Sequence, residues 1–475
     1  MSIILNRRAD LTLEACKRVA WGGEAVQLSA AARANIARAR EDFLKLITRE
    51  DITIYGVNTG YGHHAKTRLT TEGRKEQARA PTHHRAASWG DPLPGRVTRA
   101  MVFARLANII EGHAALSPHV ADAVVAMLDG GPLPIVPARG QGGAGEILSL
   151  SHLFLDLTKR VELAEKDMLS LINGSPGASA LVADAALAAK ARIDTVADVF
   201  ALAAEAFNAP LGHFAEELEA LWNNPHDAWG LRALRTRIAG GHGGARRPYQ
   251  APVSIRIMPR MLGEAHRATQ AAETVARQSL PAVSDNPVVF ISGEQRGPDA
   301  VVSTGGYHNA QAPAVMDALT ASYANLALIA SRVGAKLQDA NISLLPPFLG
   351  YPDGRTYLGC LPMAMVGYEE ELRMLAQPTL LPGSESGGYG QDDVASPVLA
   401  AWSKQERAGV LLEQTLASLS VIAMRALNVT ARPVPTPLAQ LAADTSRAFA
   451  DDEGIEALGP QLAALASTFR ERIYS

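Results

Sequence analysis

Two long segments, residues 177–208 and 394–428, constrain the fold of this chain most strongly. Both are rich in alanine and leucine and are apolar around nearly their whole circumference. A helix of this kind has no face for water, so it must be surrounded by other helices. Because hydrophobic residues make up 47% of the chain and aromatic residues only 5%, while alternating Val/Ile runs are scarce, helices are favoured over sheet. The sequence therefore predicts a mainly α-helical fold.

The chain length and its loops indicate more than one structural part. At 475 residues, the chain exceeds the size at which a single hydrophobic core usually stops growing. Polar, glycine-rich connectors separate the helical patterns, and such loops on a rigid scaffold commonly carry binding and catalytic residues. We expect a loop-rich N-terminal domain over residues 1–205 and a long-helix bundle over residues 206–475.

Charge and cysteine content exclude several classes of function. The 45 basic and 48 acidic residues leave a net charge of −3, which gives no electrostatic footprint for nucleic acid or an anionic membrane. Two cysteines are too few for a disulfide framework or a cysteine metal site. The N-terminus has no long apolar stretch, and no apolar run reaches the ~20 residues that span a bilayer. We therefore expect a cytoplasmic protein with no membrane or nucleic-acid partner.

Residues 130–146 form a Gly/Pro-dense stretch that leads directly into a predicted helix, "ILSLSHLFLDLTKRV". Glycines at a helix start can present unpaired N–H groups to an anion or to developing negative charge. The alternative is a tight loop whose glycines only permit close packing. The pattern alone leaves both interpretations open.

Six motifs occur in an order that resembles the aromatic amino acid lyase family, which includes the histidine, phenylalanine and tyrosine ammonia-lyases and related aminomutases. The motifs are "YGVNTGYG" at 55–62, "LINGS" at 171–175, "PYQAPVSIRIMPRMLG" at 248–263, "SDNP" at 284–287, "GGYHN" at 305–309 and "GQDDVAS" at 390–396. The resemblance covers nearly the whole chain. It implies an all-helical, elongated bundle and a homotetramer whose active sites draw loops from three chains.

One family feature is altered here. The family makes its electrophile, 4-methylideneimidazol-5-one, from an Ala-Ser-Gly tripeptide by cyclisation and loss of water from the serine. The corresponding residues are Gly143-Ala144-Gly145, and Ala144 has no hydroxyl to lose. We therefore expect no ring cofactor. Ala144 is either an engineered replacement for the serine or part of a naturally ring-free loop. The residues around it also differ from the family pattern, and this favours the natural loop.

Without the ring, the amine must be a good leaving group by itself. A quaternary trimethylammonium meets this requirement, because it departs as neutral trimethylamine without needing a proton. The ergothionase branch of the family lacks the ring and eliminates trimethylamine from ergothioneine. The resemblance therefore implies a ring-independent carbon–nitrogen lyase that acts on an imidazole-bearing betaine. An ordinary ammonia-lyase or aminomutase with an altered serine, and a non-catalytic homologue, remain as alternatives.

The resemblance also assigns roles to individual residues. Tyr55 matches the base that takes the β-proton, although packing with a satisfied hydroxyl is the common fate of such a tyrosine. Arg256 matches the arginine that binds the substrate carboxylate, although a surface ion pair is the commoner role of a lone arginine. Asn173 and Tyr249 match polar positions around the ring and amine, and Tyr249 is a candidate second acid/base.

Further residues are candidates for recognising the substrate. His84 falls near the position that selects the aromatic ring of the substrate. Asp392 replaces a family glutamate and could accept an N–H or offset a trimethylammonium. Gln391, also a candidate for substrate binding, and Asp393 could equally be helix-capping groups. Aromatic rings that could face a quaternary ammonium are Tyr61, Tyr307 and Tyr389. The pairs His63–His64 and His83–His84 lack metal-ligand spacing, so no metal site is expected.

Overall fold

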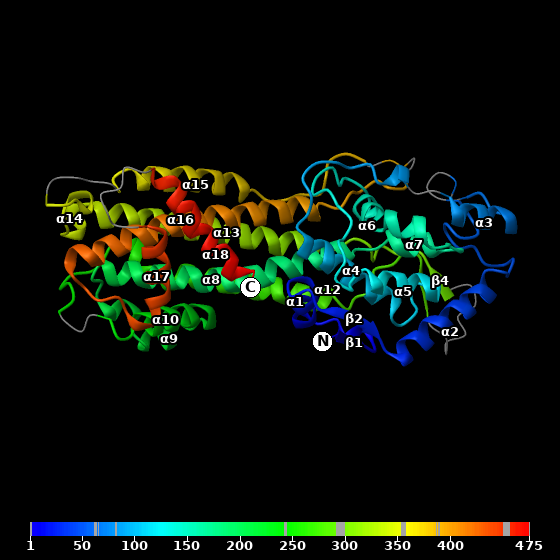
Figure 1. The fold of residues 1–475 in the computed structure, drawn as a ribbon, viewed down its shortest axis with the longest axis horizontal. Helices are drawn as coiled ribbons and strands as arrows, with labels where there is room; N and C mark the ends of the chain where they lie inside the picture. Colours follow the sequence, from blue (N-terminus) through cyan, green and yellow to red (C-terminus); the bar gives the residue numbers. More distant parts are fainter. Residues whose placement is uncertain are drawn as a thin grey trace. The chain divides into compact units, whose positions relative to one another are not determined.

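The computed structural model describes residues 2–474 apart from 61–63, 65, 81–82, 242–244, 291–299, 353–357, 386, 388–389 and 450–456. Helices dominate it, as the composition predicted (Figure 1). The two apolar segments form long helices, α8 (Pro176–Ala206) and α16 (Val398–Thr430). Because helix α16 begins at Val398, the residues of the 390–396 motif precede the helix.

The chain folds into two compact units. Unit 1 comprises residues 1–186, 272–315 and 379–403, and unit 2 comprises residues 187–271, 316–378 and 404–475. Four of the five divisions fall inside long helices, which are α8, α12 (Met258–Ser279), α13 (Gln311–Gln338) and α16, and the fifth falls in the loop between residues 378 and 379. The sequence predicted one boundary near residue 205, whereas the two units alternate along the chain. Residues 379–403, which include the first turn of α16, therefore belong to unit 1. The rest of α16 belongs to unit 2.

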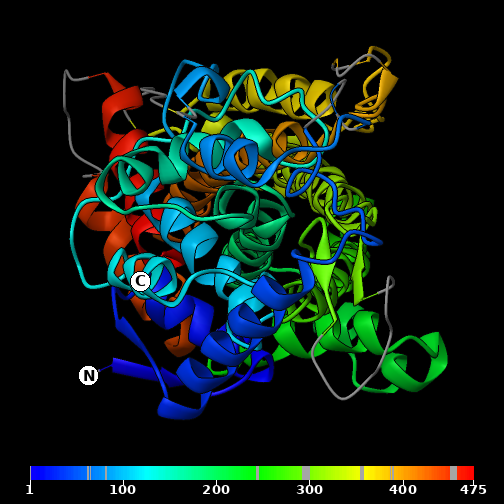
Figure 2. The ribbon, with the colours of Figure 1, turned by 90° about the vertical axis from the view of Figure 1, so that its right-hand side faces the viewer.

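Unit 1 combines short helices with long loops, as Figures 1 and 2 show for the blue and cyan part of the chain. Its complete helices are α1 (Leu13–Ala20), α2 (Ala30–Leu46), α3 (Thr71–Arg79), α4 (Gly95–Ile109), α5 (Pro118–Ala126), α6 (Ile147–Arg160) and α7 (Asp167–Ile172). Short strands β1 (Ser2–Leu5) and β2 (Ala25–Leu28) pair in parallel, and β3 (Val288–Val289) pairs antiparallel with β4 (Val301–Val302). Single-turn 3-10 helices occupy Arg8–Asp10 and His83–Arg85.

Unit 2 is mainly helical, and its described residues form no strand. Besides its parts of the four long helices, it contains α9 (Glu217–Trp222), α10 (Pro225–Ile238), α11 (Val253–Arg256), α14 (Ala340–Ser343), α15 (Leu361–Leu375), α17 (Ala439–Ala448) and α18 (Leu458–Ile473). Its 3-10 turns lie at Leu211–Phe214, Pro347–Leu349 and Thr436–Leu438. A buried network centred on Arg192 joins this helical core, because Arg192 Nε donates to Glu413 Oε1 at 2.8 Å and Nη2 to the Tyr474 hydroxyl at 3.0 Å.

Two of the long helices, α13 and α16, are strongly apolar. By length and composition alone, α13 and α16 could each cross a membrane. However, 61% of the relevant window in α13 and 83% of that in α16 is buried inside the protein, as is usual for core helices of globular proteins. Charged residues interrupt both helices, Asp317 and Arg332 in α13 and Glu413 and Arg425 in α16, so neither contains an uninterrupted apolar run of the ~20 residues that span a bilayer.

Candidate active site

Two pockets of unit 1 share Tyr55, Ile147, Asn173 and Asp392 in their linings and therefore adjoin one another. The smaller has a volume of about 160 Å³ and the larger about 600 Å³. The smaller pocket is also lined by Ala144, Gly145, Glu146, Gly174, Asn286, Ser303, Tyr307 and Gln391. The larger one is also lined by Gly60, His64, Thr67, Leu69, Gln77, His84, Arg85, Leu169 and Ile172. The structure thus brings together motifs from opposite ends of the sequence.

The Tyr55 loop is held by Asn58 of its own motif and by Gln77 of α3 (Thr71–Arg79). Asn58 is buried; its Oδ1 accepts from the Ile54 N–H at 2.6 Å, and its Nδ2 donates to the Ile52 carbonyl at 2.7 Å. The Gln77 side chain, from α3, donates to the Gly56 carbonyl at 3.0 Å. The neighbouring isoleucines Ile52 and Ile54 pack into the hydrophobic core. Tyr55 itself therefore lies on a fixed loop, half-buried between the two pockets.

The altered tripeptide forms one wall of the smaller pocket. Ala144 lines this pocket and is only 9% exposed. Gly145 has φ +59°, and a Cβ there would lie 3.2 Å from Tyr307 Cδ2, so both conformation and space favour glycine. The Gly143 carbonyl accepts from the Ser396 N–H at 3.1 Å, which joins this loop to the 390–396 motif. The Ala144 methyl group thus lies at the position that the resemblance assigns to the ring-forming serine.

Glu146 contributes a buried carboxyl group to the same pocket. Its two oxygens accept the N–H groups of Gly177 and Ala178 in the first turn of α8, at 2.5 and 2.6 Å. A Cβ at Gly177 would lie 2.5 Å from Glu146 Oε2, so this contact requires glycine. Burial raises the pKa of Glu146 to about 7, against the opposing effects of the two N–H donors and the charge of Arg105.

The raised pKa of Glu146 predicts a pH-dependent contribution to stability. Because the folded protein binds this proton more tightly than the unfolded chain, the stabilisation is complete below the ordinary pKa near 4.5 and is lost as pH rises through about 7. The variant Glu146→Gln cannot ionise and lacks this loss. Between pH 4.5 and 8, we expect its free energy of unfolding to improve relative to the wild type by about 3 kcal/mol.

Urea titrations of both proteins at pH 4.5, 6 and 8 would measure this difference. Since the other titrating groups are common to both proteins, their effects largely cancel in the comparison. A difference in unfolding free energy that stays constant across the three pH values would contradict the buried, proton-binding state of Glu146.

The polar candidates from the SDNP, GGYHN and GQDD motifs also reach the smaller pocket. Asn173 Nδ2 donates to the Asn286 carbonyl at 2.6 Å, and both residues line the pocket with Tyr307 and Gln391. Burial, together with the neighbouring charge of Asp393, raises the pKa of Asp392. Tyr61 and Tyr389 lie outside the described residues. The pocket therefore combines two acidic side chains with the described rings of Tyr55 and Tyr307.

The lining of the larger pocket includes three basic side chains, His64, His84 and Arg85. His63 lies outside the described residues. Within the part of the chain that the structure describes, no group of three or more His, Cys, Asp or Glu side chains could hold a metal ion.

Two expected site residues belong to unit 2 and line neither of these pockets. Tyr249 is 46% exposed, and its hydroxyl accepts from Arg247 Nη1 at 3.2 Å. Arg256, at the end of α11, donates from Nε to the Ala251 carbonyl at 3.0 Å. In both pockets, the described lining residues come from unit 1 alone.

Comparison with known proteins gives a consistent result. The family model "Aromatic amino acid lyase" matches residues 11–160 and 157–451. A histidine ammonia-lyase of Streptomyces coelicolor is 30% identical over 502 aligned positions, covering 97% of this chain and 94% of the relative. A histidine ammonia-lyase of Deinococcus radiodurans is 29% identical and covers 88% of this chain and 84% of the relative.

Solved structures with this fold include several enzymes. The ergothioneine-degrading enzyme ergothionase of Treponema denticola superposes with a TM-score of 0.91, at 17% identity, covering 100% of this chain and 99% of the other. The histidine ammonia-lyase of Trypanosoma cruzi has a TM-score of 0.86 at 22% identity, covering 99% and 94%. At these identities, the superpositions show a shared fold.

Proposed function

The chain belongs to the aromatic amino acid lyase family, and from this premise we propose that it is a carbon–nitrogen lyase that works without the ring cofactor. Its proposed reaction is the 1,2-elimination of trimethylamine from an imidazole-bearing amino-acid betaine such as ergothioneine. One observation carries the proposal: the Ala144 methyl group lines the same pocket as Tyr55 and Asp392, where the family places its electrophile.

The proposed elimination balances without an electrophile. Tyr55, as the base, takes the β-proton through its phenolic oxygen, the C–H electron pair forms the Cα=Cβ double bond, and the C–N pair leaves with trimethylamine. The products are an unsaturated carboxylate and neutral trimethylamine. Since the leaving group carries its own positive charge in the substrate, no covalent activation of nitrogen is needed. A positioned general base of this kind typically contributes about 10²–10⁴-fold to the rate.

The linings of the two pockets support this substrate class. A trimethylammonium group in the smaller pocket would lie among the Asp392 and Glu146 carboxyls and the face of Tyr307. The ring would occupy the larger pocket, whose lining combines apolar side chains with His64, His84 and Arg85. An imidazole-2-thione carries a polarised, partly anionic sulfur, which suits these basic side chains.

We propose that the remaining site residues come from neighbouring chains. Arg256, paired with the substrate carboxylate, and Tyr249, as a second acid/base, would complete the site in a cytoplasmic homotetramer with shared active sites. In this proposal, the partner of the site is a small molecule, and neither nucleic acid nor a membrane takes part.

Amine release from five compounds tests the proposed function. The purified protein is incubated with ergothioneine, histidine betaine, histidine, tyrosine and phenylalanine, and the products are identified by mass spectrometry. We expect trimethylamine from a betaine and no ammonia from the free amino acids. Ammonia from any amino acid would contradict the ring-free mechanism, and no reaction with any of the five would favour a non-catalytic homologue.

An ordinary histidine ammonia-lyase with an altered serine is the second candidate, favoured by the relatives of that name at 29% and 30% identity. The variant Ala144→Ser separates the two. If this second candidate is correct, the variant gains the ultraviolet absorbance of the ring and releases ammonia from histidine. Under the proposed function, it gains neither property.

A further inference from the structure

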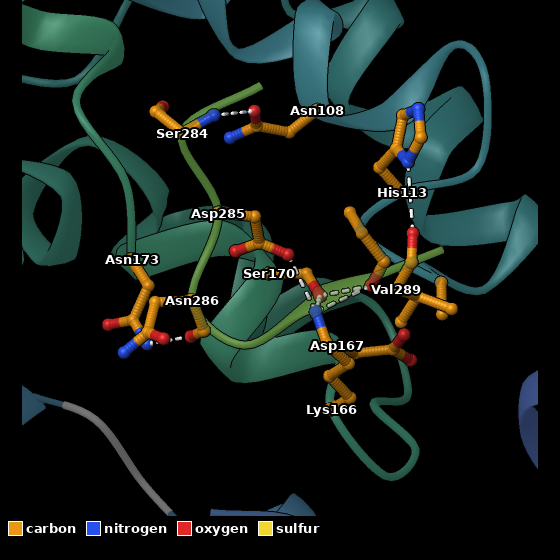
Figure 3. A network of polar contacts seen from close by, with 12 residues as sticks. Asn108, His113, Lys166, Asp167, Ser170, Asn173, Ser284, Asp285, Asn286 and Val289 are labelled. Atoms are coloured by element: carbon orange, nitrogen blue, oxygen red, sulfur yellow. Dashed lines mark hydrogen bonds and ion pairs between the residues drawn. The ribbon is translucent and has the colours of Figure 1, made fainter. Parts of the chain in front are cut away.

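Figure 3 shows a buried ion pair of unit 1 between Lys166 and Asp285, the residue before Asn286 of the smaller pocket. Lys166 Nζ donates to Asp285 Oδ2 at 2.6 Å, to the Ala114 carbonyl at 2.8 Å and to the Ser170 hydroxyl at 3.1 Å. These three contacts use all three N–H groups of the ammonium. Both charged side chains are fully buried. The pair is therefore fixed in geometry, and neither of its members lines either of the two pockets.

This pair joins the two segments that carry the pocket amides. Lys166 is the N-cap residue of α7, and Asn173 is the C-cap residue of the same short helix. Asp285 immediately precedes Asn286 in the SDNP motif. At the other end of α7, the fully buried Arg105 donates to the Ser170 and Asn173 carbonyls at 3.1 and 2.5 Å. Helix α7 is thus held at both ends by buried cations.

The loop carrying Asn286 is held along its length. The Ser284 N–H donates to Asn108 Oδ1 at 2.8 Å, and the Val289 N–H donates to the His113 carbonyl at 2.9 Å. The Asn286 carbonyl accepts from Asn173 Nδ2, as Figure 3 shows. Because Asn173 Nδ2 donates to the Asn286 carbonyl, the position of the loop that carries Asn286 determines the orientation of the Asn173 amide in the smaller pocket.

We propose that Lys166 is a positioning residue: by binding Asp285, it fixes Asn286 against Asn173 and so sets the polar wall of the small pocket. This positioning role rests on the proposed function, in which the wall formed by Asn173 and Asn286 faces the amine of the substrate. A purely stabilising role is the weaker explanation. Removing two charges from water costs several kcal/mol, so a buried ion pair commonly adds little stability over an apolar pair, and its best-attested use is to fix register.

The test compares Lys166→Met with the double variant Lys166→Met/Asp285→Asn. The single variant leaves a buried carboxylate without its cation, which lowers stability as well as activity. The double variant removes both charges and keeps the side-chain volumes close to the originals, so its Tm should recover. We expect its kcat for trimethylamine release to stay about 100-fold below the wild type, because misplacement by about 1 Å can cost that much.

A matched control is the variant Arg96→Met, which breaks another ion pair of unit 1. Arg96 Nε donates to Asp184 Oδ1 at 2.8 Å, and neither residue lines either pocket. We expect Arg96→Met to lower Tm and to leave kcat within about twofold of the wild type well below Tm.

The outcomes separate the two proposals. A double variant with near wild-type kcat in an active enzyme would overturn the positioning role and leave the proposed function intact. If Lys166→Met does not fold, the kcat of the double variant is compared directly with that of the wild type. A wild-type protein that releases no amine from any betaine would overturn the proposed function, whichever variants fold. An equal loss of kcat in Arg96→Met would also count against positioning, since it would show that activity follows stability alone.

Discussion

Replacing Tyr55 with phenylalanine is expected to lower kcat for trimethylamine release about a thousandfold while changing KM by less than about threefold. The phenyl ring keeps the packing of the loop, which is held independently by Asn58 and Gln77. Only the hydroxyl is lost, and it lies on a residue that lines both pockets. An interaction made only in the transition state affects kcat rather than KM.

Steady-state kinetics with a betaine substrate would measure this loss, with Tyr474→Phe as the matched control. Tyr474 follows α18, and its hydroxyl donates to Glu406 Oε2 at 2.8 Å in unit 2 without lining either pocket. Its replacement removes a tyrosine hydroxyl of the same chemistry and should leave kcat within about twofold. Unchanged turnover in Tyr55→Phe would assign the base to another residue.

The long helices were predictable because their signal is local. Helices α8 and α16 follow from segments rich in alanine and leucine, which favour helix, and their ends lie within a few residues of the predicted segments. The alternating division into units was not predictable in this way. It depends on which parts of four helices pack on which neighbours, and apolar periodicity carries no information on that pairing.

The candidate site was predictable only where a motif marked it. Tyr55, Asn173 and Asp392 were found through the family resemblance, and the structure places them around two adjoining pockets. Lys166 and Glu146 were missed as site residues because charged residues beside helix starts are usually solvated. Their burial arises from distant segments: Asp285 packs on Lys166, and the first turn of α8 receives Glu146. For Glu146, the sequence offered one signal of a site residue, which is an acidic residue directly after a glycine-rich loop.

Arg256 leads to the prediction with the second-largest effect. The variant Arg256→Met removes the proposed partner of the substrate carboxylate and should raise KM about 100-fold, as expected when a charge-assisted, bidentate pair is lost. Arg256 belongs to unit 2, whereas Tyr55 and the described lining of both pockets belong to unit 1. The same chain therefore need not supply both residues to one site.

Mixing the two variants distinguishes a shared site from a site built by one chain. Tyr55→Phe and Arg256→Met chains are co-expressed in equal amounts, and trimethylamine release is compared with that of each variant alone at a substrate concentration near the wild-type KM. If Tyr55 and Arg256 of one site come from different protomers, random assembly gives about a quarter of the sites both native residues, and about a quarter of the wild-type rate returns. If both residues come from one chain, every site lacks one of them, and the mixture stays at the average of its parents. Recovery in the mixture would thus establish that each active site is built from more than one protomer.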